Sequence, residues 1–496
     1  MVSKLKLLAA ALSVSAAAFS QTAADTVYVF KDDQPDFLLA PPDTSTIEYV
    51  DDFLQWEWGK SQRNTPRGVK ASYESRWTQD AARHIMAEAL GLDTISYETT
   101  PAMAHLLRKA FNTGDQSTAK AKAHFGRTRP FVQMGEDTWG QWDDDYLRTN
   151  GSFPSGHTAF GWATALVFAE MWPELQDTIL RRGFEFGENR IITGAHYQSD
   201  VTAGFLCAAA AIARAHTNPE LEKDIKAARA EYALLRGLPA DYDPVTGGDV
   251  PHGEKFLNNP VDTASYRYYG DLTRYWSTKP LRYTPRGARA ADEAVYATET
   301  IADIFGQCTG VTVSQQATPA IWALIDTVLV MNSNTVDRLK VIRFRKRPFV
   351  QLNEPSFVAG DEEKERGKSS FPSGHTGLGW TEALVLAEVA PEYQDTILRR
   401  GYEYGENRLI VGYHWFSDIE ATRQLASACV AYLHAGDGFR DMIRQAREEF
   451  LKATTPVEST RRGAMPADGR SYSLSGMPAT DTTSGVVISD GRKTVR

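Results

Sequence analysis

Apolar and polar residues follow helical rather than strand periods along most of the chain. Residues 158–171 carry apolar or small side chains on nearly every side, which predicts a helix buried in the core of a bundle. Residues 173–182 and 391–400 each begin with proline and are followed directly by glycine, the pattern of a helix with a marked start and end. Runs of alternating β-branched residues are scarce. The pattern therefore predicts an all-α fold.

Most of the chain occurs twice. Residues 65–68 (TPRG) return as residues 284–287, an offset of 219, and residues 100–102 (TPA) return as residues 318–320, an offset of 218. A period of about two hundred residues is far longer than the 20 to 50 residues of a solenoid unit. The repeat therefore predicts two copies of one complete helical-bundle domain.

The repeat also predicts the boundaries along the chain. We expect a signal peptide at 1–24, a first domain at 25–236, a linker rich in Gly, Pro and Asp at 237–253 and a second domain at 254–455. Residues 456–496 contain few large apolar side chains, so we expect a disordered tail there.

The net charge and the N-terminal sequence limit the classes of function and the cellular locations that the chain can have. The 496 residues include 54 Lys and Arg against 63 Asp and Glu, a net charge of −9 that argues against binding of polymeric nucleic acid. Any phosphate site must therefore be local. Lys4 and Lys6 precede a short apolar run and small residues, as in a secretory signal peptide. The run is shorter than a membrane span, so we expect a periplasmic or secreted protein with no membrane anchor.

The three cysteines, Cys207, Cys308 and Cys429, are an odd number and lack metal-ligand spacing. We expect no disulfide framework, and we expect Cys207 and Cys429 to act as small buried side chains. A single disulfide remains open at this stage.

Three groups of chemically active residues recur at the same spacing in both copies. They are Lys122-x6-Arg129-Pro130, then Ser155-Gly156-His157, then Arg190-x5-His196-x3-Asp200. Their counterparts, each 218 residues later, are Lys340, Arg347, Ser373, Gly374, His375, Arg408, His414 and Asp418.

The residue types and spacing of these groups indicate anion chemistry. Lys122 and Arg129 would project from one face of a helix ending before Pro130. The turn at Ser155 precedes a long helix, whose N-terminus presents unpaired N–H groups to an anion. His196 and Asp200, four apart on a helix, would make an oriented imidazole nucleophile or base. A solvated basic face, a capping serine and a core histidine are the structural alternatives, and the second copy argues against them.

These motifs resemble the three-part signature of the type 2 phosphatidic acid phosphatase superfamily. Residues 38–42, 150–158 and 177–183 further resemble the bacterial class A non-specific acid phosphatases. One departure is Asn189, with Asn407 in the second copy, where the family usually has a serine before the third-motif arginine.

The resemblance implies a helical bundle of the type shared with vanadium haloperoxidases, and a metal-independent acid phosphatase with two tandem sites and no cofactor. Lys122, Arg129, Ser155, Gly156 and Arg190 would bind the phosphoryl group. His196 would attack phosphorus, Asp200 would orient His196, and His157 would protonate the leaving group. The second-copy counterparts would take the same roles. Small phosphomonoesters are the implied substrates.

Other functions stay open beside this one. A vanadium-dependent haloperoxidase would use the same motifs, and one copy could be an inactive binding or dimerisation domain. A lipid phosphatase working inside the membrane is disfavoured because no spanning helix is predicted. An intramolecular pseudo-dimer of the two domains is a further expectation. The segments between the first and second motifs, 136–145 and 361–366, differ in sequence, so the two sites could differ in specificity.

Overall fold

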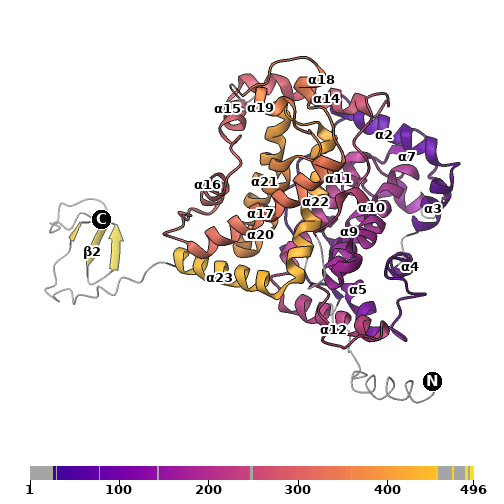
Figure 1. The fold of residues 1–496 in the computed structure, drawn as a ribbon, viewed down its shortest axis with the longest axis horizontal. Coiled ribbons are helices and arrows are strands. Elements are labelled where there is room, and N and C mark those ends of the chain that lie inside the picture. Colours follow the sequence, from indigo (N-terminus) through magenta and orange to yellow (C-terminus); the bar gives the residue numbers. More distant parts are fainter. Residues whose placement is uncertain are drawn as a thin grey trace. The chain divides into compact units, whose positions relative to one another are not determined.

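The computed structural model describes residues 26–245 and 250–455, apart from 30, 77–78, 142–143, 359 and 361, and the short segments 472–473, 486–489 and 492–495. The predicted signal peptide, residues 1–24, lies outside the described residues. The chain divides into two compact units, up to residue 450 and from residue 451 onwards. Both copies of the repeat belong to the first unit, in which every regular element among the described residues is a helix or a 3₁₀ turn (Figure 1).

The first copy is a succession of helices, as predicted. After the 3₁₀ turn η2 (Lys31–Asp33), it contains α2 (Glu48–Gln62), α3 (Pro66–Glu74), α4 (Gln79–Leu90), α5 (Pro101–Gln116), α6 (Ala119–Phe125), α7 (Pro130–Gln133), α8 (Asp144–Thr149), α9 (Gly156–Met171), η3 (Pro173–Leu175), α10 (Gln176–Ile192), α11 (Gln198–Ala215) and α12 (Pro219–Leu235).

The second copy repeats this order, except that one long helix stands in place of α5 and α6 and a 3₁₀ turn follows the counterpart of α2. It contains α13 (Gly253–Phe256), α14 (Tyr268–Thr278), η4 (Lys279–Tyr283), α15 (Pro285–Asp292), α16 (Thr298–Thr309), α17 (Pro319–Ile342), α18 (Pro348–Gln351), α19 (Glu362–Arg366), α20 (Gly374–Val389), η5 (Pro391–Tyr393), α21 (Gln394–Ile410), α22 (Phe416–Ala435) and α23 (Asp437–Thr454).

The helix that follows the Ser-Gly-His turn lies at the centre of each copy. Every residue of α9 is buried, and α9 packs against α5, α10 and α11. Its counterpart α20 packs against α17, α21 and α22 in the same way. The prediction of a helix that is apolar on all sides is confirmed, because neighbours cover each side.

The prediction that the next helix ends at Gly183, and its counterpart at Gly401, is wrong. The proline starts a 3₁₀ turn, and α10 then runs through Gly183 to Ile192. A Cβ atom on Gly183 would lie 2.3 Å from the Cβ of Ala165, and one on Gly401 would lie 2.3 Å from that of Ala383. Glycine is used there for close approach of two helices rather than to end one.

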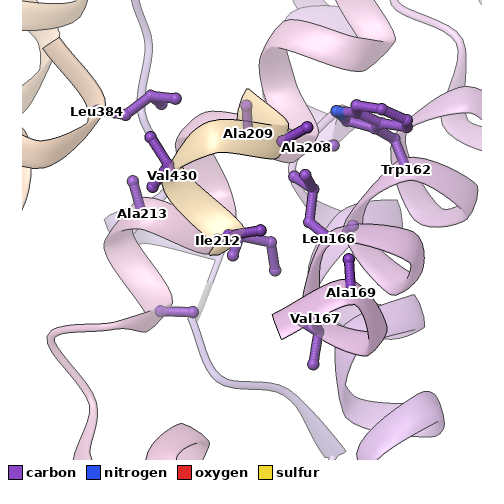
Figure 2. Close-up of a cluster of buried hydrophobic side chains, with 14 of the residues drawn as sticks. Trp162, Leu166, Val167, Ala169, Ala208, Ala209, Ile212, Ala213, Leu384 and Val430 are labelled. Carbon is purple, nitrogen blue, oxygen red and sulfur yellow. The ribbon is translucent and has the colours of Figure 1, made fainter. Parts of the chain in front are cut away.

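The two copies share one hydrophobic core. Helix α9 contacts α22, α2 contacts α14, and α11 contacts both α20 and α22. Figure 2 shows side chains of both copies in one buried cluster, among them Trp162, Leu166 and Ile212 of the first and Leu384 and Val430 of the second. The copies are therefore not separately compact.

The second unit contains the strands β1 (Tyr472–Ser473), β2 (Val486–Ser489) and β3 (Arg492–Val495), which form an antiparallel sheet in the order β1-β2-β3. For these short segments the structure differs from the predicted disorder. Residues 486–488 and 494–495 are largely β-branched, a composition that favours strands. The rest of the tail lies outside the described residues.

The three cysteines are all free thiols, and Cys207 and Cys429 are buried, as predicted. Within the described residues, no helix combines the length and the apolar composition that crossing a membrane requires.

Candidate active site

The Ser-Gly-His turn forms the start of the central helix, as predicted. Ser155 is the N-cap of α9, and its Oγ accepts a hydrogen bond from the backbone N–H of Thr158 at 3.3 Å. The backbone N–H of Ser155 donates to the carbonyl of Asp200 at 2.9 Å, so the second and third motifs are directly joined. His157, in the first turn, donates from Nε2 to the carbonyl of Ser75 at 3.0 Å.

Lys122 and Arg129 do converge, but not on one helix face as predicted. Helix α6 ends at Phe125 because Gly126 has a φ of +52°, a left-handed conformation that stops a helix. Arg129 is an extended residue just before α7. The loop between them turns both side chains to one point: Lys122 Nζ lies 3.2 Å and Arg129 Nη2 lies 3.3 Å from the carbonyl oxygen of Gly151.

His196 and Asp200 meet, but His196 precedes α11 rather than lying on it. Asp200 is the third residue of α11 and accepts a hydrogen bond from the backbone N–H of Tyr197 at 2.9 Å. The Asp200 carboxylate also lies 3.5 Å from Nδ1 of His196. Capping of α11 therefore holds the carboxylate against the imidazole.

The tautomer of His196 follows from its other neighbour. Arg129 Nη1 lies 2.9 Å from His196 Nε2, and a guanidinium can only donate, so Nε2 is the acceptor. Nδ1 then carries the proton and faces Asp200. In the second copy Arg347 Nη1 lies 3.1 Å from His414 Nε2, and His414 Nδ1 donates to the carbonyl of Ser370 at 2.5 Å. Both imidazoles thus present the Nε2 lone pair to the cations.

In each copy, an arginine that the sequence motifs did not include holds the carboxylate of the third motif in place. Arg127 donates to Asp200 at 2.6 Å and to Asp52 at 2.7 Å. In the second copy Arg345 bridges Asp418 and Asp271 at 2.6 Å each. Each bridge joins the third motif to α2 or α14. The signal was present in the sequence, since both pairs obey the repeat offsets.

Asn189, the departure from the family pattern, is hydrogen-bonded at both ends of its amide. Its Nδ2 donates to Glu74 at 2.8 Å, and its Oδ1 accepts from Arg67. Asn407 repeats this arrangement with Glu293 and Arg286. These bonds connect α10 to α3 next to Arg190, so the asparagine has a structural role beside the site.

The cations of each site are buried close together. Burial, with the neighbouring Arg129, lowers the pKa of Lys122 to about 7, and burial lowers the pKa of Arg129 to about 10. Burial, followed by the adjacent arginine, lowers the pKa of Lys340 to about 8. Arg408 is 1% exposed, and its Nε and Nη1 have no hydrogen-bond partner among the described residues. Buried donors of this kind suit a bound anion.

Each histidine of the sites has a pKa well below its usual range. Burial is the main cause in all four, followed by a nearby arginine: Arg190 for His157 and Arg129 for His196, with the equivalent arginines in the second copy. For Asp200, burial would raise the pKa, but the ion pair with Arg127 and the hydrogen bonds from His196 and Ser152 together outweigh burial and hold the pKa well below the usual range. In the first site, neutral imidazoles therefore lie beside a carboxylate.

One group of potential metal ligands is found among the described residues. It consists of Glu170, His216 and His434, between the two copies and outside both sites.

Comparison with known proteins agrees with this arrangement. The model of the PAP2 superfamily matches residues 102–222 and 317–439. A non-specific acid phosphatase of Providencia stuartii is 40% identical over 200 residues, 40% of this chain and 80% of that protein. One from Salmonella typhimurium is 35% identical over 216 residues, 42% of this chain and 86% of that protein.

An acid phosphatase of Zymomonas mobilis is 35% identical over 242 residues, 46% of this chain and 87% of that protein. Each match covers most of the relative but less than half of this chain, as a tandem duplication requires. The chain therefore belongs to the PAP2 superfamily and, within it, to the acid phosphatases.

Proposed function

We propose that the chain hydrolyses phosphomonoesters at two tandem sites through a phosphohistidine intermediate, without a metal ion. The observation that carries this proposal is the orientation of His196 and His414. In each imidazole, Nε2 faces an arginine of the first motif, while Nδ1 faces an acceptor on the opposite side of the ring. This orientation leaves the Nε2 lone pair directed towards the position where an anion would bind, as a nucleophile requires.

In the first half of the reaction, Nε2 of His196 forms a bond to phosphorus as the ester oxygen leaves. Nε2 of His157 donates to the Ser75 carbonyl, so Nδ1 is the atom that takes up a second proton when the phosphoryl anion binds beside it. Nδ1 of this imidazolium then gives that proton to the leaving alkoxide. In the second half, water attacks phosphorus, His157 takes back a proton, and the bond to His196 breaks. Orthophosphate then leaves.

Fixed positive charge supplies the stabilisation that a metal ion supplies elsewhere. Lys122, Arg129 and Arg190 would bind the non-bridging oxygens together with the N-terminal backbone of α9. The anion would in turn offset the burial and the repulsion from Arg129 that lower the pKa of Lys122. The second site has the same set in Lys340, Arg347 and Arg408.

Reciprocal contacts support an intramolecular pseudo-dimer. Arg399 of the second copy donates to the carbonyl of Leu38 at 3.1 Å, and its counterpart Arg181 in the first copy donates to the carbonyl of Phe256 at 3.3 Å. Each N-terminal segment therefore packs on the other copy, the pattern of a twofold interface. The N-terminal sequence supports a periplasmic or secreted location.

Trapping the intermediate tests the mechanism. The full chain is mixed with a ³²P-labelled aryl phosphate, quenched in alkali, and digested. We expect base-stable, acid-labile label on peptides that contain His196 and His414. Label on a serine or a carboxylate would overturn the proposal. Bromide oxidation with vanadate and peroxide, in the absence of labelling and of ester hydrolysis, would favour the haloperoxidase alternative.

A further inference from the structure

The short helices α8 and α19 are structural counterparts in the two copies. The backbone N–H of Thr138 donates to Asp144 at 3.0 Å, and that of Ser356 donates to Glu362 at 3.4 Å, each pair being 218 residues from the other. The arginine near the end of each helix lies over a phenylalanine of the preceding short helix: Arg148 lies 5.0 Å from the ring centre of Phe131 in α7, and Arg366 lies 5.8 Å from that of Phe349 in α18. The residues of α8 can therefore be compared position by position with those of α19.

One position on these helices differs in chemistry. Leu147 of the first copy is buried against Phe131 and Ala195. Its counterpart, 218 residues later, is Glu365. The apolar position changes together with its neighbour, because Ala195 corresponds to Tyr413, which packs against Phe349 in the second copy. The second site therefore has a carboxylate where the first has a leucine.

Glu365 binds an arginine of the first motif. Its Oε2 accepts a hydrogen bond from Arg347 Nη2 at 2.8 Å, and its Oε1 accepts from Lys368 at 2.8 Å. The Arg347 side chain is 4% exposed and that of Glu365 is 15% exposed, so water screens this ion pair little. In the first copy, Nη2 of Arg129 donates instead to the carbonyl of Gly151 at 3.3 Å.

We propose that Glu365 is an internal anion of the second site, which competes with the phosphoryl group for Arg347 and makes this site the weaker of the two for phosphate monoesters. A carboxylate offers Arg347 the same charge-assisted hydrogen bonds as a phosphoryl oxygen. A ligand must therefore displace Glu365 or accept its repulsion at close range. The first site, with neutral Leu147, imposes no such cost. This inference rests on the proposed function, since it assigns the anion that each site prefers.

Titration calorimetry of inorganic phosphate binding to the full chain tests the inference without catalytic turnover. We expect two binding steps whose affinities differ by roughly tenfold, the effect of about 1.4 kcal/mol. Glu365→Leu and Glu365→Gln should both strengthen the weaker step and leave the stronger one unchanged. Glu363→Gln, an exposed residue on the same helix, is the matched control and should change neither step.

The reverse exchange is made in the first site. Leu147→Glu should weaken the stronger step, whereas Leu147→Gln, which disturbs packing equally but adds no charge, should weaken it less. A single binding step in the native chain that becomes two in Glu365→Leu would also support the proposal. Unchanged or weaker binding in both Glu365 variants, with thermal unfolding as in the native chain, would overturn it.

A kinetic arm separates this inference from the proposed mechanism. With His196→Ala present to silence the first site, Glu365→Gln should lower KM for an aryl phosphate more than it alters kcat. If phosphate binding responds as expected but no site turns over substrate, the mechanism fails and the role of Glu365 stands. If turnover persists and the substitution at Glu365 leaves KM unchanged, the mechanism stands and the proposed role of Glu365 fails.

Discussion

His216 and His434, equivalent residues of the two copies, stack face to face where the copies meet, with ring centroids 3.6 Å apart and 8° between the ring planes. Each ring has a glutamate beside it: Glu170 lies 3.4 Å from His216 Nε2, and Glu388 lies 2.9 Å from His434 Nε2. The cluster is buried between helices of both copies, so its protonation state affects the stability of the contact between the copies.

The cluster predicts that stability peaks at mildly acidic pH. Burial, followed by Arg440, lowers the pKa of His434 to about 3. As pH falls below about 6.5, this histidine therefore takes up a proton in the unfolded chain but not in the native chain, and the native chain loses stability. Burial raises the pKa of Glu170 to about 8, so the native chain keeps a proton that the unfolded chain releases as pH rises above about 4.5. Stability from both groups is therefore greatest between these limits.

Urea unfolding of the full chain across pH 3 to 9 measures this effect. Glu170→Gln should remove part of the loss of stability on the alkaline side, by about 1 kcal/mol or more, and leave the acid side unchanged. Asp80, whose side chain is 85% exposed, provides a control, since Asp80→Asn should shift neither side. An unchanged alkaline slope in Glu170→Gln would show that this carboxyl is ionised in the native chain.

We expect both sites to be catalytic and independent. Each contains the full set of cations, two histidines and a carboxylate, and the two imidazoles face their arginines at 2.9 and 3.1 Å. His196→Ala should leave the activity of the second site, His414→Ala that of the first, and the double variant at least about a thousandfold less than the native chain.

Steady-state assays against a panel of phosphomonoesters measure this, with His84→Ala, an exposed histidine, as the control. Loss of nearly all activity towards every substrate from one single substitution, in a folded variant, would make the other copy a passive partner.

We expect hydrolysis to need no divalent metal. The described residues near each site provide cations for the phosphoryl oxygens, and the group of metal ligands at Glu170 lies outside both sites. Activity after dialysis against EDTA should equal that before dialysis, and vanadate should inhibit competitively. Loss of activity that zinc or magnesium restores would contradict this expectation.

Alkaline pH should weaken substrate binding at the first site before the second. Lys122, with a pKa of about 7, loses its charge as pH rises through that value, while Lys340 does so at about 8. Loss of a cation weakens binding of an anion, so KM should rise with pH, and about one pH unit earlier in His414→Ala than in His196→Ala. KM values that rise together, or that fall with pH, would contradict this reading.

Arg127 is expected to act by positioning Asp200. A lysine has one ammonium group and cannot make the two directed bonds with which Arg127 joins Asp200 and Asp52. With His414→Ala present, Arg127→Lys should lower kcat by roughly tenfold with a smaller change in KM. Arg444→Lys, on the surface, is the control. Equal kcat in the two variants would limit Arg127 to a role in folding.

The sequence by itself determined the helical class, the duplication and the chemical identity of the motif residues. Helix α9 was predictable because apolar residues on every side leave burial as the only stable outcome. The motif residues were predictable because the repeat placed Lys122, His157 and His196 at one offset from their counterparts, which chance surface residues do not keep.

Only the tertiary structure decided how these residues meet. Spacing suggested one helix for Lys122 and Arg129, yet Gly126 breaks it and the two side chains converge on the carbonyl of residue 151 instead. Gly183 looked like the end of a helix but serves the contact with Ala165. The pairing of Glu365 with Arg347 joins residues 18 apart across a loop. Such contacts depend on packing between distant segments, which local sequence patterns do not encode.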